Sequence, residues 1–100
     1  MFDINALLPQ LEKLCRKYDV KRLELVGSAV GENFREGSDV DFLVEFNDLL
    51  KPGISNRYFG LVKSLEKILY RKVDLIETGA VRNPYFKASI NKNRKLIYGA

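Results

Sequence analysis

The sequence contains no histidine and only one cysteine, Cys15. These shortages exclude an internal disulfide and the usual zinc sites, which are built from cysteine and histidine side chains. Any bound metal ion must therefore be held by oxygen atoms. Cys15 falls on the apolar stripe of a predicted helix, where a thiol packs in the core far more often than it reacts. We assign it no chemical function.

Long hydrophobic runs are also missing. No segment approaches the roughly 20 apolar residues that a membrane-spanning helix needs, and the amino terminus lacks the basic start and apolar stretch of a signal peptide. We therefore expect no membrane association and a cytoplasmic location. With 100 residues, the chain 1–100 is predicted to be a single domain with one hydrophobic core. If it is a transferase, another molecule supplies the acceptor.

Acidic residues are absent after Glu77, although the net charge of the chain is only +4. Residues 32–48, in contrast, carry six acids and one arginine. The basic tail could meet nucleic acid, a triphosphate or an acidic partner, or could be a merely solvated face. No recognised nucleic-acid motif accompanies it, so we expect no nucleic-acid partner.

Hydrophobic periodicity predicts a regular succession of helices and strands. In chain order these are a helix over residues 4–18, a strand over 22–26, a short helix over 29–34, a strand over 40–46, a helix including 58–69, a strand over 72–77, a helix from about residue 83 and a short strand over 96–98. Pro9 suits the first helix only near its start, and Gly60 should weaken the third slightly. This order predicts an α/β (α+β) domain with helices packed on a small mixed sheet.

Three aspartates could converge on one point. Asp39 and Asp41 are two residues apart on a predicted strand, so their side chains leave the same face. Adjacent carboxylates repel each other unless a cation lies between them, and Mg²⁺ prefers carboxylate and phosphate oxygens. Asp74 interrupts an apolar strand and could join them if the strands are neighbours. Three carboxylates could then bind two metal ions, with Asp74 as a candidate general base for phosphoryl transfer.

Gly27 and Ser28 follow the first predicted strand. A glycine lets the backbone approach a phosphate closely, and a serine that begins a helix offers its hydroxyl beside unpaired backbone N–H groups. Alone, this pair is most often an ordinary turn and helix cap. Combined with the aspartates, it is a candidate triphosphate-binding turn. Glu45 shares the face of Asp41 but lies further along the strand, so we expect a solvated or ion-paired surface acid.

The combined spacing is Gly27-Ser28, ten residues, then Asp39-Val40-Asp41 running into an apolar strand. It resembles the signature of the DNA polymerase β-like nucleotidyltransferase superfamily. The length, the leading helix and Val73-Asp74-Leu75 resemble the minimal nucleotidyltransferases (MNT), which are usually encoded beside a HEPN-domain ribonuclease. The resemblance implies an antitoxin that forms a complex with its HEPN toxin and transfers AMP from ATP to a toxin tyrosine. It also implies that Asp39 and Asp41 bind magnesium and that Asp74 completes the site.

The chain departs from the family pattern directly after Gly27-Ser28. Family members often have arginines there, whereas this chain has Ala29-Val30-Gly31. The departure favours a second hypothesis, a catalytically weak or inactive antitoxin that neutralises its partner by binding. Other residues that could replace the missing arginines are Arg35, Arg57 and Arg82.

Overall fold

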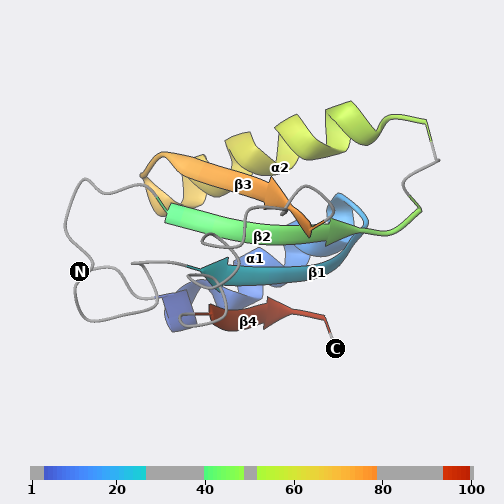
Figure 1. Cartoon of the computed structure of the whole chain (residues 1–100). Helices are drawn as coiled ribbons and strands as arrows, with labels where there is room; N and C mark the ends of the chain where they lie inside the picture. Colours follow the sequence, from blue (N-terminus) through green and yellow to red (C-terminus); the bar gives the residue numbers. More distant parts are fainter. Residues whose placement is uncertain (1–3, 27–39, 49–51, 79–93, 100) are drawn as a thin grey trace, which may run out of the picture.

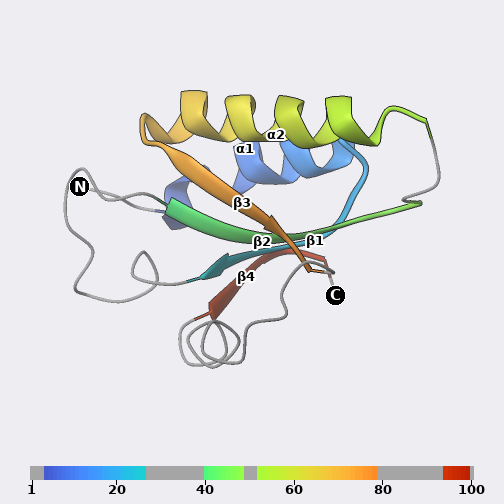
Figure 2. The same cartoon turned by 45° about the horizontal axis from the view of Figure 1, so that its top comes forward.

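The computed structural model describes residues 4–26, 40–48, 52–78 and 94–99. Within these ranges the elements are α1 (Ile4–Lys17), β1 (Val20–Val26), β2 (Val40–Phe46), α2 (Ile54–Leu69), β3 (Val73–Glu77) and β4 (Arg94–Tyr98). The strands form one sheet, drawn in Figure 1. Both helices lie side by side on the same face of that sheet (Figure 2). The predicted α+β arrangement is confirmed.

The sheet is mixed and has the strand order β3-β2-β1-β4. β1 is antiparallel to both of its neighbours, whereas β2 and β3 are parallel. A parallel pair needs a crossover connection, and α2, which lies between these two strands in the chain, provides it. The crossover brings the starts of β2 and β3 to the same end of the sheet.

The core lies between the helices and the sheet. On β2, alternate residues from Val40 to Phe46 are buried against the helices, as predicted. The fully buried helix residues opposite them are Leu11, Cys15, Leu61 and Leu65. Burial raises the pKa of the Cys15 thiol to about 12, with a smaller contribution from the charge of Glu12. The thiol is therefore protonated at neutral pH, which agrees with a packing role.

At Gly60, α2 lies close to Tyr18 in the segment after α1. A Cβ atom at this position would lie 2.6 Å from Cε1 of Tyr18. The Tyr18 hydroxyl in turn lies 3.2 Å from the hydroxyl oxygen of Ser64, one turn further along α2. The glycine therefore makes room for an aromatic ring between the helices, in addition to lowering helix propensity as expected.

Several boundaries differ from the predicted ones. β1 begins at Val20 and α2 at Ile54, both earlier than the patterns indicated. Pro9 lies inside α1, where burial of the apolar stripe compensates for a lost backbone hydrogen bond. The helices predicted over residues 29–34 and from about residue 83 lie outside the described ranges. Neither described helix has the length and apolar character needed to cross a membrane.

Candidate active site

Two of the three predicted carboxylates lie side by side on the sheet. The register of the parallel pair places Asp41 of β2 opposite Asp74 of β3. Such partners are about 4.8 Å apart and point to the same face. Their chain neighbours Phe42 and Leu75 are buried under the helices, so both carboxylates leave the opposite face. Asp74 is exposed there and Asp41 is partly exposed.

The same register extends across all four strands. Asp41 also pairs with Val26 of β1, and Val26 pairs with Arg94 of β4. We call this line of Arg94, Val26, Asp41 and Asp74 the cross-strand row. Val26 is the last residue of β1, and the predicted Gly27-Ser28 turn follows it directly in the sequence.

Val26 of the row also belongs to a small apolar cluster. Val26 and Leu43 are buried on the face away from the helices, with Ile76 packed against them. An apolar surface lowers the local dielectric, which strengthens the interaction of the neighbouring carboxylates with any bound cation. The two carboxylates therefore lie next to an apolar surface.

The donor chemistry of the row fits a hard divalent cation. Asp41 and Asp74 offer carboxylate oxygens at neighbouring positions, and Mg²⁺ is commonly held by one or two carboxylates together with water and phosphate oxygens. Among the described residues no group of three metal-ligating side chains occurs. Asp39, Gly27 and Ser28 lie outside those residues, so their roles stay predictions.

A buried acid on the same face was not singled out by the sequence. Glu24 of β1 is only 3% exposed. Its carboxylate accepts hydrogen bonds from Nε and Nη2 of Arg94, at 2.5 and 2.6 Å, and from Nε of Arg22 at 2.8 Å. The hydrogen bond from Arg94 lowers the pKa of Glu24 most, against the effect of burial, and Arg22 lowers it further. The available signal was an acid within an apolar strand, which is also what pointed to Asp74.

Arg57, one of the three arginines that could have replaced those missing after Gly27-Ser28, lies away from the aspartates. Its guanidinium donates to the carbonyl oxygens of Asn47 and Asp48, at 2.8 and 2.9 Å, and lies 5.5 Å from the centre of the Phe46 ring. These groups are at the carboxyl end of β2, whereas the aspartates are at its start. Arg57 therefore fixes the loop after β2. Arg35 and Arg82, the other two predicted substitutes, lie outside the described ranges.

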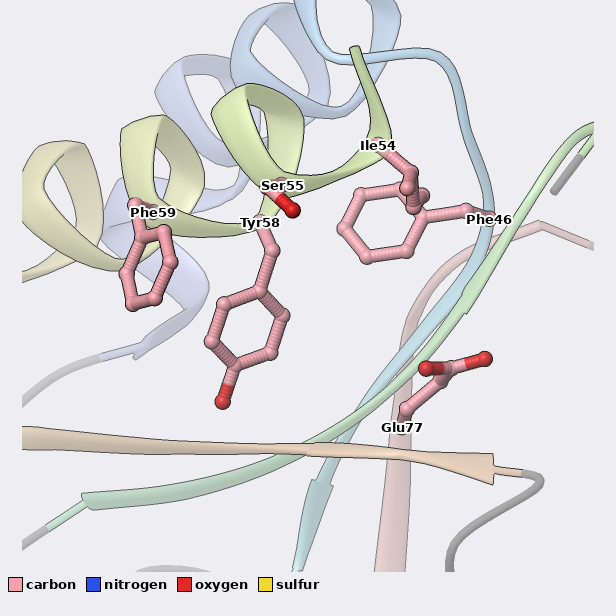
Figure 3. Close-up of a pocket in the computed structure, with 6 residues that line it drawn as sticks. All are labelled: Phe46, Ile54, Ser55, Tyr58, Phe59 and Glu77. Carbon is pink, nitrogen blue, oxygen red and sulfur yellow. The ribbon is translucent and has the colours of Figure 1, made fainter. Parts of the chain in front are cut away.

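A pocket of about 310 Å³ lies at that same distant end of the sheet. It is lined by Phe46, Ile54, Ser55, Tyr58, Phe59 and Glu77 (Figure 3). The Tyr58 hydroxyl donates to the carbonyl of Leu75, and its ring packs against the core. Asp41 and Phe46 are five residues apart on one strand, roughly 16 Å, whereas the Tyr58 hydroxyl reaches β3 at Leu75, the residue after Asp74.

Comparison with known proteins identifies the family. Residues 9–97 match the model of the nucleotidyltransferase domain family. The chain belongs to this family. The nucleotidyltransferase is 41% identical over 97 residues to a candidate protein adenylyltransferase of Methanocaldococcus jannaschii, MJ1379, covering 96% of this chain and 94% of that protein. A second candidate protein adenylyltransferase of that organism, MJ0128, is 39% identical over 100 residues with the same coverage.

Solved structures share the fold of this nucleotidyltransferase. A candidate minimal nucleotidyltransferase superposes with a TM-score of 0.72 at 23% identity, covering 92% of this chain and 90% of that one. A toxin–antitoxin complex with AMP-PNP gives 0.70 at 21% identity, covering 93% and 73%. A complex of tri-AMPylated Shewanella oneidensis HEPN toxin with MNT antitoxin gives 0.65 at 19% identity, covering 96% and 72%. The resemblance inferred from the sequence motifs is confirmed at the level of family and fold.

Proposed function

We propose that this nucleotidyltransferase transfers AMP from ATP to a tyrosine of a HEPN-domain toxin, and that it acts as the antitoxin in a cytoplasmic complex. The observation that carries the proposal is the pairing of Asp41 with Asp74, in a row whose Val26 directly precedes Gly27-Ser28 in the sequence. Two further findings support it. The similar Methanocaldococcus proteins are named as candidate protein adenylyltransferases, and one chain of similar fold belongs to an AMPylated HEPN toxin–MNT complex.

In this proposal the nucleotide is bound by both parts of the sequence motif, the Gly27-Ser28 turn and the aspartates. Asp39, Asp41 and Asp74 would hold one or two Mg²⁺ ions, and backbone N–H groups at Gly27-Ser28 would bind the triphosphate. Bound magnesium would offset the phosphate charge and lower the pKa of the attacking hydroxyl. The aspartates would thus fix the nucleotide with its α-phosphate facing the acceptor.

The transfer itself needs little from the protein beyond positioning and one base. The tyrosine oxygen attacks the α-phosphorus in line, the bond from that phosphorus to the bridging oxygen breaks, and pyrophosphate leaves. Asp74 accepts the hydroxyl proton as general base. It is exposed on β3, which is the edge strand next to β2, so a side chain of another protein can approach it.

The acceptor would come from the partner. The described elements form one sheet covered by one layer of two helices, and we propose that chain 1–100 is a single minimal domain. The acceptor tyrosine is then presented by the bound toxin. Activity should accordingly require a complex of the two proteins.

The test is transfer of label from ATP labelled at the α-phosphate, with Mg²⁺ and the protein encoded by the neighbouring gene. We expect label on the partner with the wild type, and at least about a hundredfold less with Asp41→Asn or Asp74→Asn, because several kcal/mol of charge stabilisation are lost. Glu45→Gln is the matched control. It removes the same charge from the same face of β2, but Glu45 pairs with Arg22 rather than with Asp74.

A second candidate function is neutralisation by binding alone, favoured by the sequence Ala29-Val30-Gly31 in place of arginines after Gly27-Ser28. In that case the partner carries no label, and Asp41→Asn both binds and neutralises the toxin as well as the wild type does. That result would rule out the transferase proposal.

A further inference from the structure

We infer that the pocket beside Glu77 is a docking site for an arginine side chain of the partner protein. The guanidinium pairs with the Glu77 carboxylate and lies against the rings of Tyr58 and Phe59. This inference rests on the proposed complex with a second protein and adds to it a contact on the helix-covered face of β3. It does not depend on whether AMP is transferred in that complex.

The pocket combines aromatic walls with one carboxylate. Tyr58 and Phe59 are adjacent on α2, and their ring centres are 5.3 Å apart with the ring planes at 89°. Figure 3 shows the carboxylate of Glu77 reaching from β3 towards Phe46, next to the ring of Tyr58. The volume of about 310 Å³ is at the lower limit for ligand pockets. The space therefore suits one long side chain.

Two of the three rings are fixed before a partner binds. Phe46 is buried, and the Tyr58 hydroxyl donates to the carbonyl of Leu75 on β3. A ring that is already held in place loses little freedom when it is covered. Phe59, in contrast, is 61% exposed, so a partner that covers it gains apolar burial.

The charge of the pocket favours a cation. Within the part of the chain that the structure describes, the partly buried Glu77 carboxylate makes no ion pair or hydrogen bond. Residues of the first turn of α2 also line the pocket, and the helix dipole stabilises a negative charge there. Burial raises the pKa of the Tyr58 hydroxyl, and the charges of Asp74 and Glu77 raise it further. The potential at that hydroxyl is therefore negative.

Arg57 is the cation that already lies near this pocket. Its guanidinium is 5.5 Å from the centre of the Phe46 ring, and Asp19 opposes its charge from 3.7 Å away. Phe46 thus has one cationic neighbour within the chain. For that reason we assign the incoming cation to the other two rings, Tyr58 and Phe59.

An arginine suits these groups better than a lysine or a free small cation. A planar guanidinium binds a carboxylate through two parallel hydrogen bonds, stacks on aromatic rings and is less strongly hydrated than an ammonium group. Small-molecule pockets bury most of the surface of their ligand, whereas the Phe59 wall is largely exposed. Arginine and aromatic side chains are, in contrast, the common anchors of protein interfaces.

The position of the pocket on β3 connects it with the acceptor protein. Asp74 and Glu77 leave opposite faces of this strand, because Glu77 pairs with Val44, which is buried under the helices. The three residues between them span roughly 10 Å, and β3 is at the edge of the described sheet. One side of a standard interface contains about 20 to 30 residues. A protein that brings a side chain to Asp74 therefore also reaches the pocket.

The experiment is calorimetric titration of the chain with the protein encoded by the neighbouring gene. We expect Glu77→Gln to raise the Kd at least about tenfold, through loss of a partly buried ion pair, and Phe59→Ala at least about threefold, through loss of a cation–π contact. The matched controls are Glu45→Gln, a partly exposed acid on the other face of the sheet, and Tyr70→Ala, a 92% exposed ring at the opposite end of α2. Both controls should change the Kd less than about twofold.

A double-mutant cycle identifies the occupant. Each arginine of the partner is replaced by alanine, and its effect on the Kd is measured with the wild type and with Glu77→Gln. We expect one partner arginine whose loss costs at least about tenfold with the wild type and less than about threefold with Glu77→Gln, because contacting residues are coupled. Equal effects of every arginine in the two backgrounds would overturn the inference.

Transfer kinetics distinguish docking from a structural role of Glu77. In the transfer assay, Glu77→Gln should raise the KM for the partner about tenfold and leave kcat unchanged, because only partner binding is weakened. A fall in kcat with unchanged KM would mean that Glu77 acts on Asp74 through β3, and would overturn the docking role.

The remaining outcomes separate this inference from the proposed function. Partner binding by Glu77→Gln and Phe59→Ala equal to that of the wild type overturns the inference alone, whereas absence of binding by the wild type overturns both. Binding of N-acetylarginine amide that does not compete with the partner assigns the pocket to a free cation, and self-association that Glu77→Gln abolishes assigns it to a second copy. Either result overturns the inference. If Glu77→Gln does not fold, Phe59→Ala decides, since its exposed ring is outside the core.

Discussion

The two faces of the sheet are built from the same strands but from different chemistry. On the helix-covered face, β2 presents Val40, Phe42, Val44 and Phe46, all buried and apolar. On the other face the same strand presents Asp41, Leu43 and Glu45, of which only Leu43 is buried. One strand thus serves packing with every second residue and leaves the alternate ones available for charge. The difference teaches that fold and chemistry can be altered separately in this chain.

The second face is itself divided along the strands. At the start of β2 are Asp41 and its partner Asp74, next to a small apolar cluster. Beside that cluster, β1 carries Glu24, a buried acid held by two arginines. Near the end of β2, Glu45 faces Lys21 at the surface. Burial sets Glu24 apart from the other acids, whereas Asp41 and Glu45 are both partly exposed and differ in their position along β2.

The largest loss of stability should come from removing a buried side chain on the helix-covered face of the sheet. We expect Phe42→Ala to lower the free energy of unfolding by about 3–5 kcal/mol, because it removes a fully buried aromatic ring. Asp74→Asn, an exposed change on the other face, should stay within about 0.5 kcal/mol of the wild type. Urea unfolding followed by circular dichroism measures both. Equal losses of unfolding free energy in the two variants would show that the two faces of the sheet do not differ in their contribution to stability.

The second largest loss of stability should come from replacing the buried acid Glu24. We expect Glu24→Gln to cost about 2 kcal/mol at neutral pH, since the charge-assisted hydrogen bonds from Arg22 and Arg94 are weakened. Arginine contacts lower the pKa of folded Glu24 below its ordinary value of 4.5. The stabilisation is therefore complete above that value and is lost as the pH falls through the folded pKa.

Urea unfolding across the acid range checks the sign of this effect. The stability difference between wild type and Glu24→Gln should be constant near neutral pH and should shrink below about pH 4.5. A difference that stays constant down to the lowest pH would show that the carboxylate charge is not what stabilises the fold.

Local sequence patterns were sufficient for the elements and for part of the site. The strand over Val40–Phe46 was predicted with its correct bounds and faces, because alternation is a property of adjacent residues. Asp74 was placed on a strand by the same logic. That it lies opposite Asp41 depends on the parallel pairing of β2 and β3, which the sequence left open.

Local sequence patterns could not predict contacts between segments that are far apart in the sequence. The bond from Arg94 to Glu24 joins residues 70 apart, so no periodicity links them. Gly60 was expected only to weaken α2, since its close approach to Tyr18 exists only once the helical segments pack together. Arg57 was misplaced for a related reason, because a guanidinium on a long side chain finds its partners in the folded loop, at Asn47 and Asp48.

The smallest loss of stability should come from replacing the surface acid Glu45. Glu45 lies 3.8 Å from Lys21, and their side chains are 42% and 63% exposed. Such surface pairs contribute at most about 1 kcal/mol and often nothing measurable, so Glu45→Gln should change the free energy of unfolding by less than about 0.5 kcal/mol. Glu24→Gln makes the same chemical change on the same face, and burial is the main difference between the two sites. If Glu45→Gln matched the loss seen with Glu24→Gln, burial would not be the property that separates the acids serving the fold from those left at the surface.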